Sequence, residues 1–133
     1  NLYRDILNLA SSLPNLNTNK ILQLSQNYFA KAKPSEFEIF IEMMQHFFSR
    51  LCKTGVMQKP VLPSVTDNEA KIMKSLCPNL KSARLWSEAA NISLAKLNKG
   101  YLLNIDTESL ILDAFIYLEE RYQTIYRTRI TNE

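Results

Sequence analysis

The sequence has 133 residues, of which 46% are hydrophobic and 22% charged, and its net charge is +3. This length fits one domain covering residues 1–133, and the apolar fraction is typical of a packed core, which argues against disorder. The charges are scattered, whereas a nucleic-acid-binding protein tends to carry a basic stripe. Only two glycines are present, and no GxGxxG or GxxxxGK[ST] motif occurs, which excludes the two common nucleotide-binding loops.

The cysteines and the hydropathy indicate the cellular compartment in which the protein is expected. Cys52 and Cys77 lie far apart and form no CxxC pair, so we expect buried or free thiols of a cytoplasmic protein. No apolar run reaches the roughly eighteen residues of a membrane span, and no signal peptide is evident. The sequence begins at Asn1 rather than at a methionine, and we expect it to be part of a longer protein.

Apolar residues at helical spacing predict three helices in the first half of the chain. The first covers about 2–13, and the second follows the candidate caps Asn17 or Thr18 and has Ala32 as its last apolar residue. The third begins at Pro34, and Gly55 is placed to end it in a left-handed conformation. The apolar residues of this third helix form a stripe broad enough to face core on more than one side: Phe37, Phe40, Ile41, Met44, Phe47, Phe48 and Leu51.

The second half begins after an aperiodic, proline-containing connection at residues 56–66. A short helix is predicted at about 67–77, and a fifth at about 80–99, which Gly100 ends. A sixth helix runs from about 106 to 127 or beyond. We find no convincing strand, repeat or low-complexity tract, so the sequence predicts an all-α fold, a single bundle of about five to six helices.

One helix face has the spacing of a metal site but lacks its partners. Glu38, Glu42 and His46 follow one another at i, i+4 and i+8. A metal in a bundle would need carboxylates from facing helices, and neither ExxH nor HExxH occurs, so we interpret the three as a polar face. His46 with Ser49 or Cys52 on the same helix rarely gives a productive nucleophile and base. We therefore expect no catalytic residue, no metal and no cofactor.

Two basic segments are candidates for phosphate contacts. The first comprises Lys71, Lys74, Lys81 and Arg84, and the second comprises Arg121, Tyr122, Tyr126, Arg127 and Arg129. Aromatic residues interleaved with arginine can stack bases, but these tyrosines also fall on the apolar face of the last helix, where packing explains them. The single tryptophan, Trp86, is either a core residue or a partner anchor, and the core interpretation is favoured.

The last predicted helix has a wider apolar arc than a surface helix needs. One face is enough to seat it on the bundle: Leu110, Ile111, Ala114, Phe115, Leu118, Tyr122 and Ile125. Leu112 and Ile116 extend the apolar surface about 60–100° beyond that face. Either the helix is nearly central in the bundle or the extra strip meets another subunit. The predicted partner-interface residues are Leu112, Ile116 and Tyr126.

Two separated regions resemble one protein family. The run "ARLWSEAANISLAKLNKGYLLNIDTESLILDAFIYLEE" resembles the C-terminal, or collar, domain of the bacterial DNA polymerase III delta-prime subunit. Its family pattern has an R-x-W-like start, then "LN-x-D-x-x-x-L-L-L-D". Here these are Arg84, Leu85 and Trp86, then Leu103, Asn104, Asp106, Leu110, Ile111, Leu112 and Asp113. The opening "LYRDILNLASSLPNLNTNKILQLSQNYF" is similar to the matching region of alphaproteobacterial delta-prime chains.

The resemblance implies an assembly role without catalysis. Delta-prime belongs to the clamp loader, a five-subunit assembly that opens the sliding clamp and closes it on primed DNA. Its C-terminal helical domain joins those of the delta and gamma/tau subunits in a collar. On this expectation the chain is a collar domain without its N-terminal AAA+-type module. Its partners are gamma/tau and delta, and it meets the sliding clamp and DNA only through the whole assembly.

Three alternatives stay open. The first keeps the fold and makes the chain the collar region of gamma/tau or another all-α adaptor. The second is a helical nucleic-acid-binding domain that uses the basic segments. An enzyme is the third, and it would require a perturbed nucleophile or a metal site that the sequence does not indicate.

Overall fold

The computed structural model describes residues 1–31 and 33–131, with side chains for residues 1–31 and 33–126. Ala32 therefore lies outside the described residues. In the described part of the chain all regular structure is helical, which confirms the predicted all-α bundle. The elements in chain order are α1 (Leu2–Ala10), α2 (Thr18–Phe29), a 3-10 helix η1 (Pro34–Phe37), α3 (Glu38–Met57), α4 (Glu69–Leu76), α5 (Leu80–Leu102) and α6 (Thr107–Thr131).

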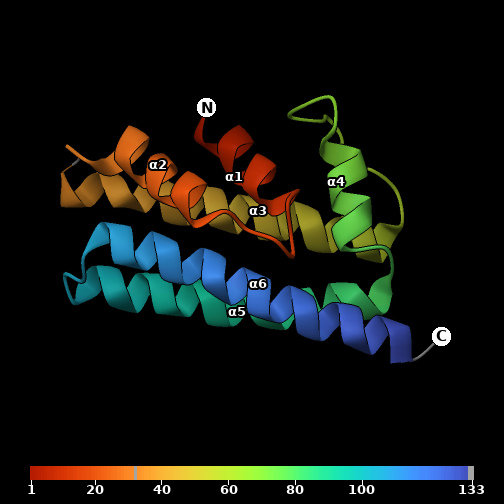
Figure 1. The fold of residues 1–133 in the computed structure, drawn as a ribbon. Helices are drawn as coiled ribbons and strands as arrows, with labels where there is room; N and C mark the ends of the chain where they lie inside the picture. The colour runs from red at the N-terminus through yellow and green to blue at the C-terminus, as the bar shows by residue number, and fades with distance from the viewer. Residues whose placement is uncertain (32, 132–133) are drawn as a thin grey trace.

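The helices are arranged around α3 and an α5–α6 pair (Figure 1). α5 and α6 run antiparallel, α1, α2 and α3 lie to one side of them, and α4 stands across the end of the bundle. α3 packs on α5, and α6 packs on both α5 and α2. Every member of the predicted α3 stripe is buried, which confirms that this helix faces core on more than one side.

Aromatic rings join α3 to its neighbours. The rings of Phe37 and Phe40 stack with centroids 5.5 Å apart, and Phe40 meets Phe115 of α6 edge-on at 6.2 Å. The ring of Phe29 in α2 contacts the rings of Phe37 and Phe40, with centroids 5.9 and 6.1 Å apart. Such pairs contribute about 0.5–1.5 kcal/mol each beyond their burial. Trp86 is fully buried and its indole N–H donates to the Leu76 carbonyl at 2.9 Å, which confirms the core interpretation.

Side-chain caps begin several helices where the sequence predicts a start. Asn17 accepts hydrogen bonds from the first amides of α2, and the Asp106 carboxylate accepts the Ser109 N–H at 3.1 Å. Asn79 and Ser82 form a reciprocal capping box at the start of α5. α1 ends at Ala10, earlier than predicted, where the Ser11 and Ser12 hydroxyls bond back to backbone carbonyls.

The prediction that the two glycines end helices is wrong. Gly55 lies inside α3 and Gly100 inside α5, and neither has a positive φ. The left-handed positions are Gln58 (φ 54°), which caps α3, and Asn104 (φ 57°), which follows α5. Asparagine tolerates this conformation better than most residues, so a glycine is not needed after α5.

Close packing accounts for both glycines instead. A Cβ at Gly55 would lie under 3.0 Å from Cys77 Sγ, the Asn79 carbonyl oxygen and Ala83 Cβ. A Cβ at Gly100 would overlap the end of the Leu110 side chain. Glycine thus allows α5 and the chain before it to approach α3, and it allows α6 to approach α5.

Candidate functional site: a groove between two helices

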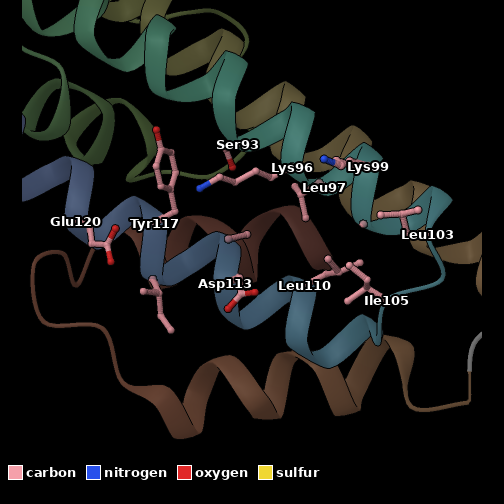
Figure 2. Close-up of a pocket in the computed structure, with 13 residues that line it drawn as sticks. Ser93, Lys96, Leu97, Lys99, Leu103, Ile105, Leu110, Asp113, Tyr117 and Glu120 are labelled. Atoms are coloured by element: carbon pink, nitrogen blue, oxygen red, sulfur yellow. The ribbon is translucent and has the colours of Figure 1, made fainter.

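A groove of about 450 Å³ lies between α5 and α6, next to the loop that joins them (Figure 2). Its apolar lining is Leu97, Leu103, Ile105, Leu110, Ala114 and Ile116. Three of these side chains are well exposed: Leu103 by 62%, Ile105 by 47% and Ile116 by 43%. Exposed apolar side chains that share one groove are characteristic of a partner-binding surface.

The loop between the helices places two of these residues. Ile105 N–H donates to the Gly100 carbonyl at 2.9 Å, Leu103 N–H donates to Lys99, and Asp106 then caps α6. This short turn uses its backbone groups internally and leaves Leu103 and Ile105 at the surface. Because Gly100 has no side chain, Leu110 packs directly over α5 and forms part of the groove wall.

The two walls of the groove carry opposite charges. Lys96 and Lys99 project from α5, whereas Asp113 and Glu120 project from α6 (Figure 2). The Lys96 ammonium lies 4.5 Å from the centre of the Tyr117 ring, a cation–π contact that holds it over the groove. Among the described side chains the single ion pair is Arg50–Glu69, so none of these four charges has an opposite charge within 4.0 Å.

Two buried hydroxyl groups at the groove have no hydrogen-bond partner among the described residues. They are Ser93 Oγ and Tyr117 Oη. Ser93 is only 2% exposed. A buried hydroxyl left without a partner costs about 1–3 kcal/mol. A polar atom of a bound molecule that reached Ser93 would remove this cost.

The three predicted interface residues lie in different surroundings. Ile116 lines the groove, whereas Leu112 is half-buried and packs against the core. Tyr126 is 42% exposed and lines a small crevice with Leu76 and Pro78. Ten residues of helix separate it from Ile116, or roughly 15 Å. The structure therefore brings only Ile116 to the groove.

The central position of α6 explains part of the wide apolar arc, whereas the contact of the remaining strip with another subunit stays a prediction. α6 packs on two helices, α2 and α5, which accounts for the burial of Leu112. Ile116 is left at the surface. Sequence reasoning missed Leu103 and Ile105, although three apolar residues in the short segment "LLNI" between two helices were a usable signal.

The three residues with metal-site spacing on α3, Glu38, Glu42 and His46, have separate surroundings. Glu38 accepts a hydrogen bond from the Tyr101 hydroxyl at 3.0 Å, and the His46 ring meets Tyr3 edge-on at 5.3 Å. Glu42 is exposed. Within the described residues no group of three potential ligands is close enough to hold a metal ion. Burial, followed by the nearby Cys77, raises the pKa of the Cys52 thiol to about 11, which suppresses its thiolate at neutral pH.

A second cleft, of about 480 Å³, gathers part of the predicted basic set. Lys59, Lys71 and Lys74 line it between the end of α3 and α4. Lys74 lies in the last turn of α4, where the helix dipole favours a cation. Lys81 and Arg84 are exposed on α5 and do not line this cleft.

The C-terminal basic segment is only partly described. Tyr122 and Tyr126 stack on each other with ring centroids 5.9 Å apart. Arg121 lies 6.0 Å from the Tyr117 ring. The side chains of Arg127 and Arg129 lie outside the described residues.

A buried polar network, which the sequence did not reveal, fixes the long connection between α3 and α4. Arg50 donates to Glu69 at 2.6 and 3.0 Å and to the carbonyls of Val61 and Pro63 at 3.0 and 2.9 Å. Glu69 also accepts from the Tyr3 hydroxyl and from Val65 N–H. Burial alone raises the pKa of the Glu69 carboxyl, but these hydrogen bonds outweigh it, so its pKa lies below the ordinary value.

Within the described residues, no helix is both long and apolar enough to cross a membrane. Comparison with known proteins gives no match. No family model fits the chain, and no curated protein or solved structure is significantly similar to it.

Proposed function

We propose that this chain is a non-catalytic assembly domain, and specifically the collar domain of a bacterial DNA polymerase III delta-prime subunit. The groove between α5 and α6 is the observation that carries the proposal, because it exposes Leu103, Ile105 and Ile116 together. The groove also lies within the segment whose sequence resembles the delta-prime collar. In this role the chain is cytoplasmic and serves DNA replication by holding its subunit beside gamma/tau and delta.

Burial of the groove side chains would drive the association. Each of the three is roughly half exposed, so its burial against a partner is expected to contribute on the order of 1 kcal/mol. Collar contacts between different subunits are heterologous, which means that the surface on one subunit differs from the surface it meets. The proposal assigns no catalytic residue and no cofactor to this chain.

Size-exclusion chromatography with light scattering tests the assembly. The chain is run alone and then with collar fragments of gamma/tau and of delta from the same organism. We expect a heteromeric complex, and Ile116→Lys should weaken it at least tenfold because the substitution places a charge in the groove. Val56→Lys is the matched control, since Val56 is an aliphatic residue of similar exposure on α3 that does not line the groove.

Other outcomes would assign the chain differently. Failure of the folded chain to bind either fragment would refute the delta-prime proposal. Homotypic association typical of gamma/tau collars would favour that subunit instead. Tight DNA binding that falls steeply with salt would favour the nucleic-acid-binding alternative. Tyr126→Lys tests the predicted interface residue outside the groove.

A further inference from the structure

We propose that the α5–α6 groove receives one amphipathic helix of the neighbouring subunit, with an acidic row of that helix facing α5 and a basic row facing α6. This inference rests on the proposed assembly function and specifies the chemistry of the partner. It follows from the shape of the groove, from the separation of its charges and from the buried Ser93 hydroxyl.

A helix fits this groove better than an extended segment does. The backbone groups of α5 and α6 are paired within their own helices, so the walls offer no free edge for strand pairing. They offer side chains only, which suits a helix because its backbone is also satisfied internally. From Leu110 to Glu120 the groove follows α6 for about 15 Å, or nearly three helical turns.

The separated charges define the two edges of the bound helix. Lys96 and Lys99 belong to one wall and Asp113 and Glu120 to the other, and none of them is in an ion pair with a described side chain. A helix with carboxylates toward α5 and lysines or arginines toward α6 complements both walls. Turning that helix end for end would exchange its edges and place like charges together. The charge pattern therefore fixes the chain direction of the bound helix.

A second copy of this chain fills the groove less well. Two copies meeting groove to groove would bring two concave surfaces together and leave space between them. A convex helix can instead contact the floor. The Ser93 side chain, 2% exposed and without a hydrogen-bond partner among the described residues, lies at this floor.

The test measures the affinity for the gamma/tau collar fragment at low ionic strength. Two charge reversals are compared, Lys96→Glu/Lys99→Glu and Asp113→Lys/Glu120→Lys, together with the fourfold variant that combines them. Lys20→Glu/Lys53→Glu and Glu36→Lys/Glu42→Lys are matched controls with the same changes of net charge at exposed sites outside the groove. Circular dichroism checks that each variant remains folded.

We expect each groove reversal to weaken binding about tenfold or more, with the effect shrinking at high salt. The controls should bind like the wild type. The fourfold variant has the wild-type net charge but reversed walls. Its binding should stay weak, because the bound helix is part of a folded collar domain and cannot turn end for end by itself. Ser93→Ala should also weaken binding without lowering the stability of the isolated chain.

Three results would overturn the inference. If the wild type binds and the groove reversals have no effect, or the fourfold variant regains affinity, the polarity is wrong although the assembly function stands. Self-association of the chain that Ile116→Lys abolishes would make a second copy the occupant. If neither the gamma/tau nor the delta fragment binds, the proposed function is refuted and this inference falls with it.

Discussion

Replacing Arg50 should strongly lower the free energy of unfolding. Arg50→Met keeps most of the aliphatic volume but removes the guanidinium, which supplies two hydrogen bonds to Glu69 and two to carbonyls of the connection between α3 and α4. The Glu69 side chain is only 3% exposed, so its carboxylate cannot recover these bonds from water. Tyr3 and Val65 N–H remain as its donors.

The expected loss of stability follows from the Glu69 carboxylate, which Arg50→Met leaves without its cation. Removing one partner of a buried ion pair costs about 3–5 kcal/mol because the remaining charge is uncompensated. This is a large share of the roughly 5–15 kcal/mol that stabilises a typical domain. The double variant Arg50→Met/Glu69→Leu removes the stranded charge as well, so it should be more stable than Arg50→Met alone.

Urea unfolding followed by circular dichroism measures both free energies of unfolding. Arg84→Met, at an exposed position, is the control and should differ from the wild type by less than about 0.5 kcal/mol. Amide exchange should show that Arg50→Met loosens residues 58–68 first. If Arg50→Met lies within about 1 kcal/mol of the wild type, or the double variant is no better than the single one, the network does not hold the connection as described.

Three further predictions concern single sites. The pKa of Glu69 in the folded protein lies below its ordinary value of 4.5, so the ionised carboxylate stabilises the fold above pH 4.5. The free energy of unfolding should fall as the pH drops below 4.5, and Glu69→Gln should flatten this decline. Gly55→Ala should lower the free energy of unfolding in urea by about 1–3 kcal/mol, because the new methyl meets backbone as well as side chains. Gly100→Ala should lower it less, because the Leu110 side chain can move. Equal losses would contradict this reason. Ser93→Ala should raise the melting temperature of the isolated chain, since it removes a buried hydroxyl without a partner, and a clear fall would show that the hydroxyl is satisfied.

The local sequence was enough for the helices and their main caps. Apolar spacing identified the buried stripe of α3, and Asn17 and Asp106 marked helix starts, because both signals act over one or two turns of a single helix. The all-α class followed from the same patterns. The glycine prediction failed because the sequence shows that a residue has no side chain. It does not show whether a helix end or a close helix contact requires this.

The tertiary structure decided everything that depends on two segments meeting. Gly55 matters because the chain around Cys77 and Asn79 approaches α3, and Arg50 pairs with a carboxylate nineteen residues away in sequence. The candidate site is assembled in the same way. The loop residues Leu103 and Ile105 gain significance only when the α5–α6 turn places them beside Ile116. Helical periodicity specifies which face of one helix is apolar, whereas the packing of a second helix determines how much of that face stays exposed.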